Sequence, residues 1–198
     1  MTPPRERKPW PMKWVVLAIA VFILGYTYLN LRYRKPVSFE PYEDARERAR
    51  IASVGYRRVS LNLRQPAGNR LVPSAGPVPV PGGLPADLYA SLIEKPRLPE
   101  SIGAVSAAPS LESGDLYRVR FRCASPGVHL QLGSAHLYQK SGVLYLVVGY
   151  VPIIDELAVR DTRTEVLLTA PANSVKSGRY RVVLVGRRES KAWPLIIR

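Results

Sequence analysis

Three arginines alternate with large apolar residues in the segment YRVRFRC. Side chains of a β-strand point alternately to its two faces, so these arginines share one face and repeat about 7 Å apart. Guanidinium groups in a row suit phosphate or carboxylate ligands, because each offers a fork of N–H donors. A second strand-like segment, RYRVVLV, carries two further arginines in the same alternation. The candidate residues for binding an anion or a partner are Arg118, Arg120, Arg122, Arg179 and Arg181. The alternative is that these arginines form a solvated outer face with scattered acidic partners.

Side chains that usually carry catalysis are few. The chain has two histidines and one cysteine, and no HExxH, GxSxG, P-loop or GxGxxG run accompanies them. His129 alternates with apolar neighbours and is expected to face solvent, whereas Cys123 continues the apolar side of a strand and is expected to be buried. Asp155 and Glu156 are adjacent in sequence, so on a strand or turn their carboxylates would diverge. The sequence therefore predicts no catalytic residue, no metal, no cofactor and no enzyme.

An apolar stretch of 18 uncharged residues, WVVLAIAVFILGYTYLNL, occupies positions 14–31. As a helix it would be roughly 27 Å long, close to the hydrocarbon thickness of a bilayer. Trp14 at one end and Tyr26 and Tyr28 at the other would lie at the two membrane interfaces. The segment lacks a small-residue cleavage site of the A-x-A kind. It is therefore interpreted as an uncleaved single-pass anchor rather than a signal peptide.

Positive charges flank this stretch on both sides, so the positive-inside rule does not decide its orientation. Because the helix lies so close to the start and acids dilute the distal basic cluster, the sequence favours a cytoplasmic N-terminus and an extracytoplasmic C-terminal domain at the cytoplasmic membrane. Met12 is an alternative start to Met1. The net charge of +14 favours contact with polyanions such as lipid headgroups, envelope polymers or nucleic acid, without choosing among them.

Proline, glycine and charge divide the remaining chain. Acids early and arginines late in PYEDARERARIASVG, followed by glycine, predict a helix over 41–53, interpreted as a juxtamembrane stalk or as a partner-binding helix with alanines on one face. YRRVSLNLR predicts a short strand. Six prolines between Pro66 and Pro85 predict an extended spacer. The expected parts are a basic tail at 1–13, a transmembrane helix at 14–31, a stalk at 32–64, a Pro-rich linker with a short helix at 65–96, and a β domain at 97–198.

Short apolar or alternating runs fill that last region, from IGAVSAA to AWPLII, and they are separated by Gly, Pro, Ser and Asn. Many short strands at such intervals are typical of a mainly β fold, a β-sandwich first and a closed barrel second. In YRVRFRC the residues Tyr117, Val119, Phe121 and Cys123 are expected to face the core. With a single cysteine in the chain, no intrachain disulfide supports the fold.

Three segments resemble bacterial immunoglobulin-like and fibronectin-type domains: PESIGAVSAAPSLESG, GDLYRVRF and SGRYRVVL. The resemblance implies an immunoglobulin-like β-sandwich and places Tyr180 at a tyrosine corner, with its hydroxyl bonded to upstream backbone. The paired cysteines and the third-strand tryptophan of antibody domains are missing.

Such domains serve mostly as binding or spacing modules. We therefore expect a membrane-anchored envelope protein that binds a protein partner or its own copies, or alternatively one that binds an anionic ligand through the arginines.

Overall fold

A computed structural model describes residues 11–33, 42–66, 76–153 and 163–198. The chain divides into two compact units, one ending at Pro41 and the other running from Tyr42 to Arg198. The expected strand ELAVR, at 156–160, lies outside the described residues, as do Asp155 and Glu156.

The described residues of the first unit form helix α1 (Met12–Tyr33), which confirms the helix expected at 14–31. Its 18-residue window Met12–Leu29 has a mean hydropathy of 1.8, and none of the window is buried within the protein. The helix is therefore long and apolar enough to cross a membrane, by length and composition, although a signal sequence can meet the same criteria.

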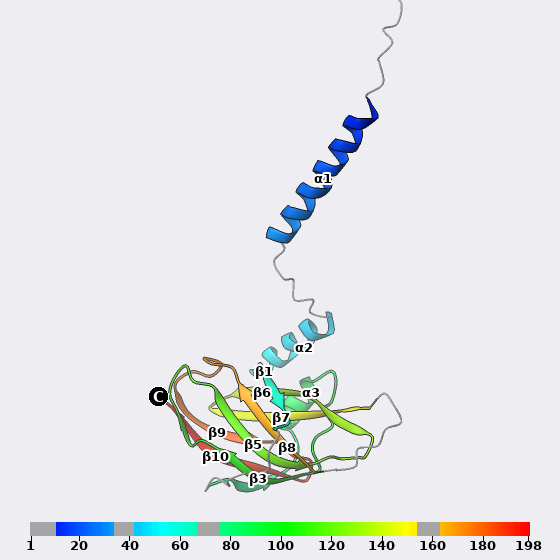
Figure 1. The fold of residues 1–198 in the computed structure, drawn as a ribbon. Helices are drawn as coiled ribbons and strands as arrows, with labels where there is room; N and C mark the ends of the chain where they lie inside the picture. Colours follow the sequence, from blue (N-terminus) through cyan, green and yellow to red (C-terminus); the bar gives the residue numbers. More distant parts are fainter. Residues whose placement is uncertain (1–10, 34–41, 67–75, 154–162) are drawn as a thin grey trace, which may run out of the picture. The chain divides into compact units, whose positions relative to one another are not determined.

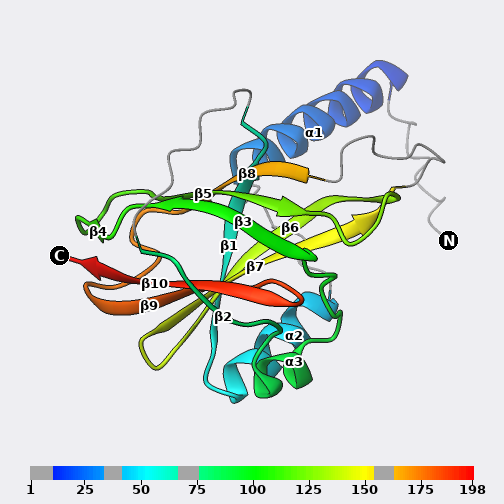
Figure 2. The same cartoon turned by 90° about the horizontal axis from the view of Figure 1, so that it is seen from below.

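The second unit is mainly β, as the sequence predicts, and its described residues form one curled ten-stranded sheet (Figures 1 and 2). In the order of hydrogen-bonded neighbours it reads β2-β10-β9-β7-β6-β1-β8-β5-β3, and β4 pairs with β10 in parallel. The strands are β1 (Arg57–Arg64), β2 (Val78–Pro81), β3 (Ser101–Ala107), β4 (Ser110–Leu111), β5 (Tyr117–Ala124), β6 (Leu130–Lys140), β7 (Val143–Pro152), β8 (Arg163–Ala170), β9 (Gly178–Leu184) and β10 (Glu189–Ile197).

Strand β1 makes the sheet continuous. Its first half pairs with β6, from Arg57 to Leu61, and its second half pairs with β8, from Asn62 to Arg64. In Figure 2, β3, β5 and β8 lie on one side of the unit, β7, β9 and β10 lie on the other, and β1 crosses between them. The described strands thus form a curled half-barrel in which two separate sandwich sheets are not seen, and the globular unit begins at Tyr42 rather than at 97.

The inside of the curl holds the main hydrophobic core. Tyr117, Val119, Phe121 and Cys123 are all buried there, as the alternation predicts, and Phe121 is fully buried. The indole Nε1 of Trp193 donates to the Tyr117 hydroxyl at 2.8 Å, which satisfies two polar groups inside the core. Burying one large apolar side chain stabilises a fold by about 1.5–3 kcal/mol, so this shared interior is what holds the curled sheet together.

A second hydrophobic cluster lies on the outer face of β6, β7 and β9, under helices α2 (Tyr42–Ser53) and α3 (Ala86–Ser91). Its members are Ile51, Tyr56, Leu88, Leu92, Tyr138, Val147 and Val185. Helix α2 matches the helix expected at 41–53, and it is followed by Gly55, whose φ of 87° suits glycine. The solvated-stalk interpretation is corrected here, because Ile51 is 1% exposed while Ala45, Ala49 and Ala52 face outward.

The linker expected at 65–96 is partly incorporated into the globular unit. Strand β2 adds VPVP to the edge of the sheet against β10, where Pro79 and Pro81 are tolerated because an edge strand needs N–H groups on one side only. Helix α3 is held by Asp87, which accepts from the Tyr56 hydroxyl at 2.9 Å and pairs with Lys140 at 2.5 Å. The Lys140 ammonium, together with the Tyr56 hydroxyl and the Leu88 N–H, lowers the pKa of the Asp87 carboxyl.

The hydroxyl of Tyr180 donates to the backbone carbonyl of Lys176 at 2.9 Å. This bond to upstream backbone was the local feature implied by the resemblance to immunoglobulin-like domains. Only the mainly β architecture is shown, however, since a single curled sheet is common to several β folds.

Candidate functional site

The three arginines of β5, Arg118, Arg120 and Arg122, are called the arginine stripe below. They lie on the outer face of their strand, opposite the core residues, as the alternation predicts. Arg118 and Arg122 are exposed, whereas Arg120 is half-buried.

The stripe has an acidic partner on the neighbouring strand. Glu165 of β8 lies 3.1 Å from Arg120 and 3.8 Å from Arg122, both measured to Nε, and its own side chain is only 11% exposed. Its carboxylate oxygens accept no other hydrogen bond among the described residues. The stripe is therefore partly neutralised in place, and Arg118 is its most available member.

Arg179 and Arg181 lie elsewhere. They are exposed on the outer face of β9, whose opposite face carries Val182 and Leu184 into the core. In the sheet, β9 and β5 are separated by β7, β6, β1 and β8. The two sets therefore belong to opposite walls of the curled sheet, and the structure does not bring the five candidate arginines into one site.

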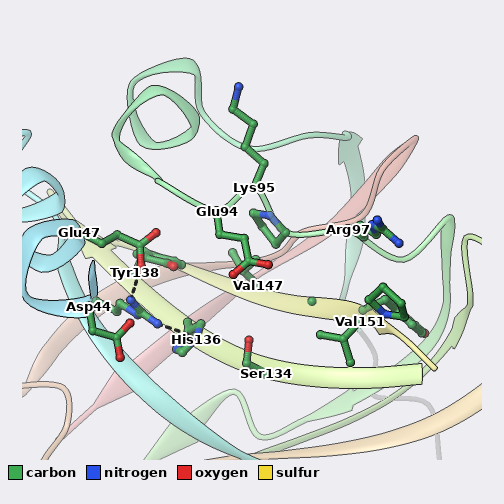
Figure 3. Close-up of a pocket in the computed structure, with 15 residues that line it drawn as sticks. Asp44, Glu47, Glu94, Lys95, Arg97, Ser134, His136, Tyr138, Val147 and Val151 are labelled. Atoms are coloured by element: carbon green, nitrogen blue, oxygen red, sulfur yellow. Dashed lines mark hydrogen bonds and ion pairs between the residues drawn. The ribbon is translucent and has the colours of Figure 1, made fainter. Parts of the chain in front are cut away.

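A polar cleft that the sequence does not reveal lies on the outer face, between α2, β6, β7 and the segment 94–97 (Figure 3). We call it the His136 cleft. Its volume is about 290 Å³. The lining residues are Asp44, Glu47, Arg58, Glu94, Lys95, Pro96, Arg97, Ser134, His136, Tyr138, Val147, Gly149, Tyr150, Val151 and Pro152.

Small residues make room for the cleft. Strand β6 has an irregularity between Leu132 and Ala135, and this displaces Ser134 from regular pairing with β7. Across from it, Gly149 has no side chain to fill the cleft: a Cβ there would lie 3.6 Å from Pro96 and from the Ser134 carbonyl, an ordinary contact distance. The segment 94–97 forms a further wall of the cleft, and the Tyr150 N–H holds it in place by donating to the Arg97 carbonyl at 3.0 Å.

One end of the cleft is closed by a chain of three charged or polar side chains. Arg58 of β1 donates to Glu47 of α2 at 2.6 Å and to Nε2 of His136 on β6 at 2.9 Å. The other Glu47 oxygen accepts from the backbone N–H of Ile93 at 3.1 Å. A buried carboxylate with two well-placed donors, one of them a guanidinium, is stable in its charged form. These hydrogen bonds tie α2 both to the sheet and to the segment that follows α3.

The same chain sets the state of His136. Arg58 has no acceptor capacity, so Nε2 accepts the bond and the ring proton lies on Nδ1. Burial, with the positive charge of Arg58 in second place, lowers the pKa of His136 to about 4, and Asp44 opposes the change. A neutral histidine whose free lone pair is already used cannot act as a general base. Among the described residues, no group of three His, Cys, Asp or Glu is placed to hold a metal ion.

His129 and Cys123 take the places that the sequence predicts. His129 is exposed just before β6. Cys123 is buried, with its Sγ 3.2 Å from the Tyr150 hydroxyl, and burial raises the pKa of the thiol. Neither residue lines the His136 cleft.

Sequence reasoning missed the cleft because its parts come from segments with different predicted roles. Asp44 and Glu47 belong to the expected stalk, Arg58 to the short strand and Glu94 to the expected linker. The available signal was the charge pattern on α2: Glu47 stands on the same helical face as Ile51, four residues later, and thus on the side that packs.

Comparisons of the chain with protein-family models, with curated proteins and with solved structures found no match.

Proposed function

We propose that this chain is a non-enzymatic protein, held in the cytoplasmic membrane by α1, that presents the unit Tyr42–Arg198 outside the cytoplasm to a protein partner. The observation that carries the proposal is the apolar surface of α1: the helix has 22 residues, and its 18-residue apolar window has no burial within the protein. A helix of this kind is costly to leave in water and is stable in a bilayer.

The second unit supplies the binding role in this proposal. Its polar cleft contains a histidine that cannot accept a proton through Nε2, with a fixed Glu47–Arg58 pair beside it. Such a rigid, preorganised surface lowers the entropic cost of recognising a partner. The immunoglobulin-like relationship is kept as part of the proposal, supported by the bond from Tyr180 to the Lys176 carbonyl.

Two measurements test the tether and its orientation. The full chain should remain with membranes after carbonate extraction, whereas a fragment lacking residues 1–41 should be released. Protease added to intact spheroplasts should then remove the unit that begins at Tyr42, while a cytoplasmic marker stays protected. Complete protection of this unit would contradict the orientation, and extraction of the full chain by carbonate would contradict the tether.

The alternative function, binding of an anionic polymer or headgroup, is favoured by one observation. A hollow of about 270 Å³ lies at the end of β5, lined in part by Ser101, Arg122 and Arg163. Binding of the chain to heparin, if lost on Arg118→Ser with Arg122→Ser and weakened by salt, would support this function. Equal binding by that variant would exclude the arginine stripe.

A further inference from the structure

The charged side chains of the His136 cleft are not evenly distributed. Glu47 and Arg58 neutralise each other at one end, and His136 is neutral. Lys95 turns away from the cleft, with its ammonium 4.5 Å from the centre of the Tyr89 ring. Asp44 and Glu94 have no hydrogen bond or ion pair with any other described residue. Two carboxylates thus remain unpaired among the described lining residues, against one cation, Arg97, in a chain whose net charge is +14.

The positions of the charged side chains show at which end of the cleft a cationic ligand group would lie. Figure 3 shows the Glu94 carboxylate and the Ser134 hydroxyl pointing toward one another across the cleft, with Asp44 beside His136. Arg97 stands at the opposite end, near Val151. Between the two ends, Val147, Gly149, Val151 and Pro152 provide apolar lining. The unpaired carboxylates are therefore concentrated at one end of the cleft, and apolar lining separates them from Arg97.

We propose that the His136 cleft binds a primary ammonium or guanidinium group on an apolar stem, namely a lysine or arginine side chain of the protein partner. This inference rests on the proposed function, since it names the chemistry by which that partner is recognised. The cationic head lies between Glu94 and Asp44 and donates to the Ser134 hydroxyl, while the stem packs over Gly149 and Val147.

The size and the donor count agree with this ligand. A volume of 290 Å³ is at the lower limit of ligand sites, which begin at about 300 Å³, and it suits one long side chain. At the end of the cleft that holds Glu94 and Asp44 an anion would find few donors, because Arg58 already donates to Glu47 and His136 and Arg97 stands at the opposite end. The remaining buried donor, Nδ1 of His136, has almost no exposed surface and does not reach a ligand.

The test measures binding of small probes to the full chain in lipid nanodiscs by isothermal titration calorimetry. The cationic probes are Nα-acetyl-lysine methylamide and Nα-acetyl-arginine methylamide, and free cadaverine represents a small-molecule amine. Nα-acetyl-norleucine methylamide has a similar stem without charge, and Nα-acetyl-glutamate methylamide is the anion. We expect the lysine or arginine probe to bind, the norleucine and glutamate probes to bind at least about ten times more weakly, and added salt to weaken binding.

Three variants locate the site. Glu94→Gln and Asp44→Asn each remove one carboxylate charge, and each should weaken the cationic probe about tenfold. Gly149→Leu fills the slot, because a side chain there has ordinary contacts and no strained φ, and it should abolish binding. Glu112→Gln is the matched control, an exposed acid far from the cleft, and it should change nothing. A melting curve for each variant shows that the fold is retained.

Each outcome decides the proposal. Equal or tighter binding of the glutamate probe, no binding of any cation, or full binding by Glu94→Gln with Asp44→Asn would overturn it. Tighter binding of cadaverine than of both amino-acid probes would overturn the protein source while keeping the chemistry. The proposed function has its own test: it would be wrong if the wild-type chain crosslinks to no protein in membranes. If crosslinking occurs and persists in Gly149→Leu, only the assignment of the partner site to this cleft is wrong.

Discussion

The two walls of the curled sheet share one core but differ in what lies outside them. The outer face of β5 and β8 is open, and polar groups such as Arg118 and Thr169 stand on it. The outer face of β6, β7 and the last residues of β9 is covered by α2 and α3 over a second hydrophobic cluster, whereas Arg179 and Arg181 earlier in β9 are exposed. A wall with one buried face shows strict alternation in sequence, whereas a wall buried on both faces has continuous apolar runs such as VLYLVV.

The difference also explains where a cleft can form. On the open wall, ligands would meet long exposed arginines whose ordering costs entropy. On the covered wall, α2 and the segment 94–97 stand above the sheet and leave a hollow between them. Charged groups in that hollow are held by neighbours on several elements, so they are preorganised.

The largest expected effect on the comparison of the two walls comes from deleting the covering helices α2 and α3 together with strand β1. A fragment 42–198 is expected to fold, whereas a fragment beginning at Arg97 lacks α2, α3, β1 and β2 and exposes the unpaired edges of β6 and β8. The shorter fragment should aggregate or stay unfolded. The reactivity of the Cys123 thiol measures this, because the thiol is buried in the fold. A protected thiol in the shorter fragment would refute the structural role of residues 42–96.

The shared core should be the most sensitive single site. Phe121→Ala removes a fully buried aromatic ring, and it should lower the free energy of unfolding by about 3–5 kcal/mol. Urea titration of fragment 42–198, followed by fluorescence of its sole tryptophan, Trp193, gives the value. Leu116→Ala, at an exposed neighbouring position, is the control and should change little. Equal losses in the free energy of unfolding for the two variants would contradict the assignment of Phe121 to the core face of β5.

The covered wall is tested through α2. Ile51→Ala should cost about 2–5 kcal/mol because Ile51 is 1% exposed between the helix and the sheet. Ala52→Ser, one residue later on the exposed side of the same helix, serves as its control in the same urea titration. If Ile51→Ala lowered the free energy of unfolding no more than Ala52→Ser does, α2 would not be packed against the sheet and the stalk interpretation would be right.

On the open wall, the stability of the fold should depend on the ion pairs of Glu165 with the arginine stripe. Arg120→Ser with Arg122→Ser leaves a carboxylate that is 11% exposed without its cations, so a loss of about 1–3 kcal/mol is expected. Adding Glu165→Gln should recover part of the loss, because the uncompensated charge is gone. Arg118→Ser alone should stay within about 0.5 kcal/mol. An unchanged stability in the double variant would mean that solvent already screens Glu165.

The smallest effect concerns His136 and pH. Its pKa in the fold is about 4, below the ordinary value of 6.5, so the unfolded chain binds a proton first as the pH falls. Stability should therefore be full above pH 6.5 and decline toward pH 4, by about 1–2 kcal/mol between pH 7 and pH 5. The difference between wild type and His136→Gln across this range isolates the effect. His129→Gln, which changes an exposed histidine, should follow wild type.

The sequence by itself determined the features that local periodicity controls. Eighteen uncharged and mostly apolar residues in a row specify α1, because a helix of that length satisfies its own backbone and has the length needed to cross a bilayer. Period-two alternation specified the inward set of Tyr117 to Cys123, since only one register buries the apolar side chains. Punctuation by acids, arginines and Gly55 specified the end of α2.

Only the tertiary structure decided which segments meet. Arg57–Arg64 became a central strand, and Tyr42–Ser53 became a cover for the sheet, because pairing and burial across long sequence distances have no local signature. For the same reason the arginines of β5 and β9, alike in sequence, lie on opposite walls, while Glu94, Asp44 and His136 line one cleft. The sequence gives the type of each side chain, but a site also requires neighbours in space, and only folding brings these together.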